Sequence, residues 1–354
     1  MSDHYLQIPI ALQVELSSNC NINCTGCVRT DLLTYDKTGN PLIEKNKFLD
    51  IEIFKSVINS PSNGNLTRIE FCGSIDDPLM YPKFLEILSF LKEKKIRSAI
   101  HTNGSLRTPD YFSEIAKLTK DIKASGINFS IDGLEDTNHL YRRGANWGKI
   151  IENAKAFIDA GGNATWQFIV FPWNSHQVED AKKLSEQMGF SKFKVRNDRN
   201  FSAIDNFEPY IEYEKNRRKL SWDEYTDALT KKIEDSEISC FTRNEQYYFI
   251  SYDGKLWPCC FLHNARFRRQ NFYTEYHDRF NNNYGKDWND LYLKSFEEII
   301  NNKFYSEDLV DSWKTTTHGT GCKDRIVRCS ETCSKKSRSE RPLGEHTVSV
   351  FKTP

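Results

Sequence analysis

The stretch ALQVELSSNCNINCTGC, residues 11–27, decides the fold expected for this chain. In its first half the apolar residues Leu12, Val14 and Leu16 alternate with polar ones, which is the pattern of a β-strand. In its second half three cysteines follow with the spacing C-x3-C-x2-C. A strand that leads directly into closely spaced thiols predicts a metal-binding loop at the end of the first strand.

Strand and helix patterns continue to alternate up to about residue 196. Strand-like runs occur at 66–72, 96–102, 126–132, 165–171 and 193–196. Apolar residues at helical spacing predict helices at about 50–60, 84–91, 109–119, 147–158 and 178–188. Because parallel strands are joined by crossover helices, this alternation predicts an α/β fold with a parallel sheet that is open or curled into a partial barrel.

The rest of the chain has a different character. Residues 197–239 are polar and predict a linker with a solvated helix at about 221–235. Residues 247–260 predict a hairpin that turns at Asp253-Gly254, within a small irregular domain of the kind that a metal holds together. The predicted domains are a core at 1–196, a linker or helical segment at 197–239 and a cysteine-rich domain at 240–354.

Composition excludes some classes of protein. The chain has 49 Lys and Arg against 49 Asp and Glu, so its formal net charge is zero. This balance disfavours a protein that binds nucleic acid or an anionic membrane mainly through an extended positively charged surface. The sequence has no apolar run long enough to cross a bilayer and no secretion signal at its N-terminus, so we expect a cytoplasmic protein with reduced thiols.

Ten cysteines therefore need an explanation other than disulfides. Nine lie in two groups, at 20–27 and 240–333, with Cys72 between them. Clustered cysteines in a reduced compartment indicate metal binding or catalysis. The three thiols of the first group would leave one iron of a four-iron cluster open to a further ligand. A zinc site would instead require a fourth protein ligand nearby. No His or Cys lies between Cys27 and Cys72 to provide one. A zinc loop and incidental buried thiols are the alternatives.

The first group resembles the signature of the radical S-adenosylmethionine (SAM) superfamily. The resemblance implies a partial (β/α)6 TIM-like barrel and a 4Fe–4S cluster held by Cys20, Cys24 and Cys27, with SAM chelating the open iron. Gly26 departs from the family pattern, which usually has an aromatic residue before the third cysteine.

Segments at the predicted strand ends extend the resemblance. The run Cys72–Leu79 is similar to the family's glycine-and-acid segment and implies that Gly73 and Asp77 hold the SAM ammonium group, although Asp76 stands where glycine is commoner. A turn built from Gly, Asp and Pro is the alternative.

Two later segments resemble the family in the same order. The run His101–Gly104 is similar to its Thr-Asn-Gly segment and implies a SAM contact for Asn103. By the same resemblance Ser130 lies near the SAM ribose and Arg143 near its carboxylate. Neither Cys72 nor His101 is given a catalytic role.

The second cysteine group has the spacing C-x13-G-x4-C from Cys240 to Cys259, followed by Cys329-x3-Cys333. It resembles the C-terminal auxiliary-cluster extension of radical SAM enzymes, the SPASM domain or its shorter twitch form. The resemblance implies one auxiliary 4Fe–4S cluster on these four cysteines, with Cys260 and Cys322 in reserve. Zinc is the alternative, because four cysteines suit zinc equally well.

The function implied by the resemblance is reductive cleavage of SAM to a 5′-deoxyadenosyl radical that abstracts a substrate hydrogen. The auxiliary cluster would assist oxidation or modification of a peptide or of a small alcohol or sugar. A flavodoxin or ferredoxin-type electron donor is an expected partner, and nucleic acid and membrane are not. The competing hypothesis is a non-enzymatic zinc-stabilised binding protein. No substrate acid or base is identifiable.

Overall fold

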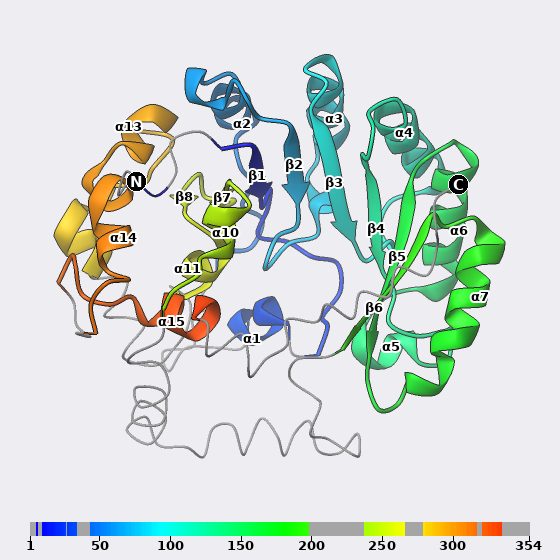
Figure 1. Ribbon diagram of the computed structural model, residues 1–354. Helices are drawn as coiled ribbons and strands as arrows, with labels where there is room; N and C mark the ends of the chain where they lie inside the picture. The colour runs from blue at the N-terminus through cyan, green and yellow to red at the C-terminus, as the bar shows by residue number, and fades with distance from the viewer. Residues whose placement is uncertain are drawn as a thin grey trace. The chain divides into compact units, whose positions relative to one another are not determined.

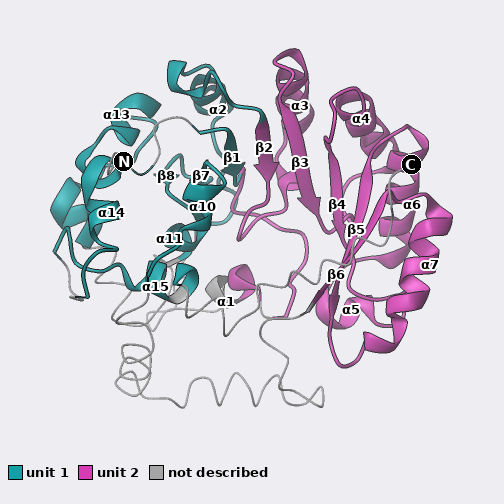
Figure 2. Ribbon diagram, in the orientation of Figure 1, with its two compact units in different colours: residues 1–15, 35–67, 220–342 teal, residues 16–34, 68–219, 343–354 magenta. Residues whose placement is uncertain are grey.

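The computed structural model of the chain describes residues 5, 9–25, 27–33, 43–197, 237–265, 279–316 and 321–334. The helix predicted at 221–235 lies outside these residues. The chain divides into two compact units, which Figure 2 colours separately. Unit 1 comprises residues 1–15, 35–67 and 220–342, and unit 2 comprises residues 16–34, 68–219 and 343–354. Within these described ranges, eight strands form a mostly parallel sheet that does not close, which confirms the predicted α/β partial-barrel class.

Unit 2 contains five strands that pair in parallel in the order of the sequence. They are β2 (Arg68–Phe71), β3 (Arg97–Thr102), β4 (Gly126–Ser130), β5 (Ala164–Val170) and β6 (Lys192–Asn197). Long helices cover one face of these strands (Figure 1), namely α3 (Phe84–Glu93), α4 (Pro109–Thr119), α6 (Trp147–Asp159) and α7 (Val178–Met188). The short helices are α1 (Val28–Leu33), η2 (Pro78–Met80), α5 (Asn138–Tyr141) and η3 (Ser175–Gln177). All five strands match the predicted runs.

Capping residues explain where these helices begin and end. Thr108 accepts a hydrogen bond from the backbone N–H of Tyr111 at the start of α4, and Pro109 occupies the first helical position. Gly189 ends α7 with a φ of 85°, which glycine adopts without steric cost.

The strands of unit 2 have one apolar and one polar face. Ile69, Phe71 and Ile100 are fully buried on the side of the helices. Their neighbours Glu70 and His101 are half-buried on the opposite side. A parallel sheet buried on both faces would be apolar on both, so the polar face is suited to lining a ligand cavity.

Unit 1 contains β1 (Ala11–Val14), which pairs in parallel with β7 (Tyr247–Ile250), and β7 forms an antiparallel hairpin with β8 (Leu256–Trp257). The predicted hairpin is confirmed. Gly254 lies in its turn with a φ of 71°, and a Cβ there would clash with the Tyr292 ring. The pairing of β1 with β7 is not predictable locally, because no pattern within either strand names its partner.

The remaining elements of unit 1 are short, and the Tyr305 ring packs against the rings of Tyr248 and Trp288. These elements are α2 (Ile51–Ile58), η1 (Pro61–Asn63), α10 (Phe241–Asn244), α11 (Cys260–Ala265), α13 (Phe296–Ile300), the π-helical η4 (Phe304–Asp308), α14 (Leu309–Asp311) and α15 (Val327–Cys333). Among the described residues, no helix combines the length and apolar character that crossing a membrane requires.

Candidate metal and cofactor sites

The three N-terminal cysteines lie on one loop of unit 2. Cys24 is 7% exposed, and Cys20 and Cys27 are half-buried. The backbone N–H of Cys27 donates to the Cys24 carbonyl at 3.3 Å. The backbone N–H of Asn23 donates to the Arg143 carbonyl just beyond α5 at 2.9 Å, and that of Thr25 donates to the Tyr141 carbonyl at the end of α5 at 3.1 Å. Because the backbone is held on both sides of Cys24, its thiol has a defined position before any metal binds.

Two consecutive residues, Asp76 and Asp77, form hydrogen bonds with the start of this loop. The Oδ2 atom of Asp76 accepts hydrogen bonds from the backbone N–H groups of Leu16 and Ser17, at 3.0 and 3.1 Å. The backbone N–H of Asp77 donates to the Asn19 carbonyl at 2.9 Å. Sequence reasoning missed this role of Asp76, and its departure from the family's usual glycine was the available signal.

The Asp77 side chain links the end of β3 to the same loop. Its carboxylate is buried and accepts from the Thr102 hydroxyl at 2.9 Å and from the Asn103 side-chain amide at 2.7 Å. That amide nitrogen also lies 2.9 Å from the Asn21 Oδ1 atom and 3.9 Å from the Cys20 Sγ atom. Burial raises the pKa of Asp77 above its ordinary value, although hydrogen bonds from the backbone N–H of Asn103 and from the Thr102 hydroxyl oppose this shift.

Arg142 places a positive charge beside the thiols. Its Nε atom lies 2.6 Å from the Oδ2 atom of the fully buried Asp132, and its Nη1 atom donates to the Cys24 Sγ atom at 3.7 Å. Burial raises the pKa of Cys24 to about 11, with the Arg142 charge acting in the opposite direction. Sequence reasoning named the neighbouring Arg143, whose side chain is exposed, and missed Arg142.

The remaining predicted SAM contacts lie at strand ends. Gly73 is half-buried directly beyond β2, and Ser130 is half-buried as the last residue of β4, opposite Gln167 in the register. The structure thus joins Cys20, Asp77 and Asn103 by direct contacts. The roles of Gly73, Ser130 and Arg143 stay predictions.

Replacing Arg142 with methionine is expected to destabilise the protein by about 3–5 kcal/mol, because it leaves the Asp132 carboxylate buried without its ionic partner. The matched control is Arg143→Met, which removes an exposed charge and is expected to change stability by less than about 0.5 kcal/mol. Urea unfolding of both variants checks this. Equal effects would contradict the assignment of Arg142 to the buried pair.

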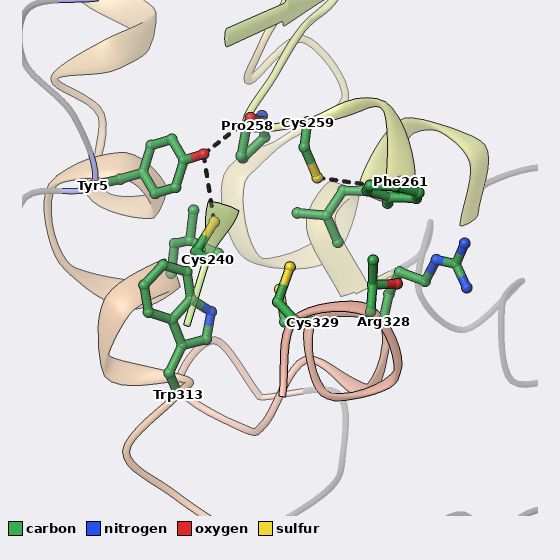
Figure 3. Close-up of a pocket in the computed structure, with 12 residues that line it drawn as sticks. Tyr5, Cys240, Pro258, Cys259, Phe261, Trp313, Arg328 and Cys329 are labelled. Atoms are coloured by element: carbon green, nitrogen blue, oxygen red, sulfur yellow. Dashed lines mark hydrogen bonds between the residues drawn. The ribbon is translucent and has the colours of Figure 1, made fainter. Parts of the chain in front are cut away.

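Four cysteines of the second group line one pocket of unit 1 (Figure 3). Cys240 precedes α10 and Cys259 precedes α11, while Cys329 and Cys333 lie one turn apart on α15. All four are at most 9% exposed. Cys260 and Cys322 are half-buried and are not among the residues that line the pocket.

Hydroxyl groups surround one of these thiols. The Cys240 Sγ atom lies 3.2 Å from the Thr242 hydroxyl, which in turn lies 2.6 Å from the Tyr5 hydroxyl. A hydrogen bond from Cys333 lowers the pKa of Cys240, with Thr242 acting in the same direction against the effect of burial. Burial raises the pKa of Cys259 well above its ordinary value. A thiolate at Cys240 is therefore supported by local donors.

The spacing of the thiols tests which metal group fits. Four thiolates around one zinc ion at about 2.3 Å would lie about 3.8 Å from one another. Among the described residues, which include all ten cysteines, no three thiols have their sulfur atoms mutually within 4.8 Å. The described thiols are therefore not arranged around a preformed zinc site.

Comparison with known families agrees with this geometry. The model of the Radical SAM superfamily matches residues 14–184. The SPASM model, an iron–sulfur cluster-binding domain, matches residues 240–334. The first match includes the N-terminal cysteine loop, and the second includes all four cysteines of the pocket.

Curated relatives match in part. The tungsten-containing aldehyde ferredoxin oxidoreductase cofactor-modifying protein of Pyrococcus furiosus is 24% identical over 133 residues, which are 38% of this chain and 33% of that protein. The AdoMet-dependent heme synthase of Nitratidesulfovibrio vulgaris is 28% identical over 180 residues, 49% of this chain and 44% of that protein. The matches thus span less than half the length of either relative.

Solved structures share the fold. Streptococcus suis SuiB bound to S-adenosylmethionine matches with a TM-score of 0.52 at 15% identity, over 86% of this chain and 66% of that chain. Native anSMEcpe with bound AdoMet and Cp18Cys peptide matches with a TM-score of 0.54 at 16% identity, over 93% of this chain and 90% of that chain.

Proposed function

The chain is a radical SAM enzyme with a C-terminal SPASM domain, and from this premise we propose which residues hold its cofactors. Cys20, Cys24 and Cys27 hold the SAM-binding 4Fe–4S cluster. One auxiliary 4Fe–4S cluster is held by Cys240, Cys259, Cys329 and Cys333. The observation that carries this assignment is that these four, out of six C-terminal cysteines, line a single pocket.

The bound cluster and SAM supply one-electron cleavage of SAM to a 5′-deoxyadenosyl radical and abstraction of a substrate hydrogen atom. The chain's own residues position these groups. Arg142 offsets thiolate charge at Cys24, and Asp77 fixes the Asn103 amide beside Cys20. We assign SAM contacts to Gly73, Asp77, Asn103, Ser130 and Arg143. A flavodoxin or ferredoxin-type protein would be the electron donor.

The proposed substrate is a peptide. Two proteins that share this fold are known in complex with peptides, SuiB with its precursor SuiA and anSMEcpe with Cp18Cys. A small molecule is the second candidate, favoured by the names of the curated relatives, which modify a cofactor or make heme. A small alcohol or sugar belongs to this second class.

Anaerobic reconstitution followed by a 5′-deoxyadenosine assay tests the proposal. The expected protein contains about eight iron atoms per chain, four for each cluster, and forms 5′-deoxyadenosine from SAM when reduced. Zinc-loaded protein that cleaves no SAM would support the binding-protein alternative instead.

Replacing Thr242 with valine is expected to lower the reduction potential of the auxiliary cluster. The Thr242 hydroxyl lies 3.2 Å from Cys240, and hydrogen bonds to ligand sulfur stabilise the more negative, reduced state. At a fixed potential, the ratio of oxidised to reduced cluster should rise about tenfold, equivalent to about 59 mV for one electron.

Redox titration followed by electron paramagnetic resonance (EPR) measures this shift, with the SAM-binding cluster as internal reference. Thr242→Ser keeps the donor and should keep the wild-type potential. Equal potentials in the valine and serine variants would rule out the hydrogen bond as the cause.

A further inference from the structure

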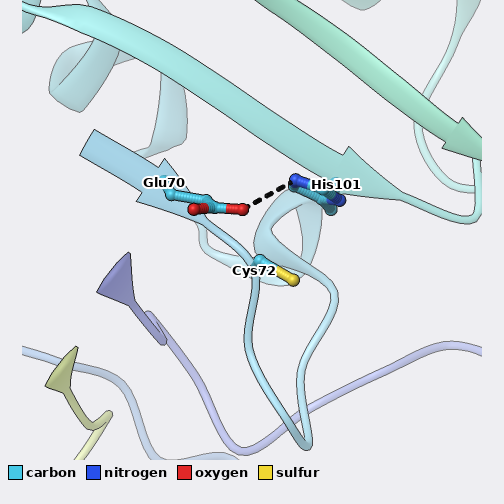
Figure 4. Close-up of side chains that lie close together, drawn as sticks. All are labelled: Glu70, Cys72 and His101. Atoms are coloured by element: carbon cyan, nitrogen blue, oxygen red, sulfur yellow. Dashed lines mark ion pairs between the residues drawn. The ribbon is translucent and has the colours of Figure 1, made fainter. Parts of the chain in front are cut away.

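A polar cluster outside both cysteine groups lies on the open face of the unit 2 strands (Figure 4). The Glu70 Oε1 atom on β2 lies 3.1 Å from the His101 Nε2 atom on β3. The Asn128 amide on β4 lies 3.2 Å from the same nitrogen. The Cys72 Sγ atom lies within 4.8 Å of both the Glu70 and His101 ligand atoms. These side chains are half-buried, and neither cofactor assignment uses them.

The edge strand β6 adds positive charge to this face. Phe193 packs against Trp166 on the helix side, with ring centroids 6.0 Å apart, so the alternating residues Lys194 and Arg196 lie on the same side as Glu70. In a flat sheet β2 and β6 would be separated by about 19 Å, four strand spacings. The sheet is an unclosed partial barrel, so its curvature brings β6 closer to β2 than this, and the charge of Arg196 contributes to lowering the pKa of Glu70.

The balance of charge on this face is positive. Burial would raise the pKa of Glu70, but its hydrogen bond to His101 and the charges of Arg68 and Arg196 bring that pKa below its ordinary value. Burial lowers the pKa of Lys194, and the like charge of Arg196 lowers it further. Lys194 is half-buried and Arg196 is exposed, and two like charges on one face of the same strand are stabilised by an anion. The same cations disfavour a divalent metal at Glu70, Cys72 and His101.

We propose that this face binds an oxyanion group of the substrate, a carboxylate or a phosphate, through Lys194 and Arg196. The Glu70–His101 pair then contacts the part of the substrate next to that group, as donor and acceptor. The inference rests on the proposed function only in assigning the oxyanion to the substrate. The anion site itself, on β6 on the same face as Glu70, is argued from the charges and contacts of the side chains on this face.

Cys72 provides a reporter for this site. In the reconstituted protein, the rates at which iodoacetate and iodoacetamide alkylate Cys72 are measured by mass spectrometry under anaerobic conditions. Iodoacetate carries the carboxylate that the site should attract. In the double variant Lys194→Gln, Arg196→Gln, the iodoacetate-to-iodoacetamide rate ratio should fall about fivefold, because two nearby cations are lost.

The matched control is Lys183→Gln, which removes an exposed lysine on α7 and should leave the ratio at its wild-type value. A double-variant ratio equal to that of the control overturns the proposal. The measurement does not depend on SAM cleavage. If the rate ratio falls about fivefold in the double variant but the protein forms no 5′-deoxyadenosine, the anion site is supported and the proposed function is rejected.

Competition in the wild-type protein provides a second measurement that needs no variant. Inorganic phosphate and acetate are each added before alkylation by neutral iodoacetamide. Slower labelling of Cys72 with phosphate identifies a phosphate site, and slower labelling with acetate identifies a carboxylate site. No slowing by either anion, at matched ionic strength, overturns the proposal.

Discussion

Replacing Cys24 with alanine is expected to abolish 5′-deoxyadenosine formation and to remove about half of the iron, one cluster of two. Cys24 is the buried member of its trio, held between backbone contacts to the end of α5 and a hydrogen bond from Arg142. With two thiols left on the loop, a four-iron cluster lacks a required ligand. Iron analysis and the SAM cleavage assay, made on the same anaerobic preparation, check both expectations.

The control for this experiment is Cys322→Ala. Cys322 is half-buried and does not line the pocket of unit 1, so its loss should leave iron content and SAM cleavage at wild-type levels. Retained cleavage in Cys24→Ala, or equal losses in the two variants, would contradict the assignment of the N-terminal loop.

Replacing Cys329 with alanine is expected to remove the auxiliary cluster and to destabilise unit 1. Four buried thiols surround its pocket, and in such small irregular domains the free energy of metal binding contributes to folding. A loss of about 3–5 kcal/mol would lower the unfolding midpoint by about 10 °C for a unit of this size. Anaerobic calorimetry and iron analysis measure the two effects.

Cys260→Ala is the matched control for this second variant. Cys260 directly follows the pocket residue Cys259 but does not line the pocket. Its substitution should keep all of the iron and nearly all of the thermal stability. A Cys329 variant that keeps its full iron content would show that the cluster, if present, is held by other residues.

The sequence predicts the strands well because their pattern is local. Leu12 and Val14 alternate with polar neighbours, and β1 lies where this pattern occurs. The pairing of β1 with β7 depends on contacts between residues more than two hundred positions apart, such as Ala11 with Tyr247. Nothing in either segment specifies the other, so this part of the fold required the structure.

The cofactor sites show the same division. The spacing of Cys20, Cys24 and Cys27 is a local signal and identified the loop. The contact of Arg142 with Cys24 is not a local signal, because it depends on which side chain reaches the buried Asp132. Sequence reasoning therefore did not identify this contact, and its assignment of Arg143 to the SAM carboxylate stays a prediction.

The structure shows which cysteines of the second group line the pocket of unit 1. Four cysteines were favoured from spacing, with Cys260 and Cys322 in reserve. The helix α15 places Cys329 and Cys333 one turn apart, on the pocket side. Cys322 lies before this helix and outside the pocket lining, which no spacing rule could decide.

In the proposed assignment, one cluster is open to SAM and the other is closed by four thiolates. EPR spectra of the reduced, reconstituted protein, recorded with and without SAM, test it most directly. We predict two 4Fe–4S signals, of which SAM changes the one that Cys24→Ala removes and leaves unchanged the one that Cys329→Ala removes. A protein in which SAM changes neither signal, or changes the signal that depends on Cys329, would contradict the account.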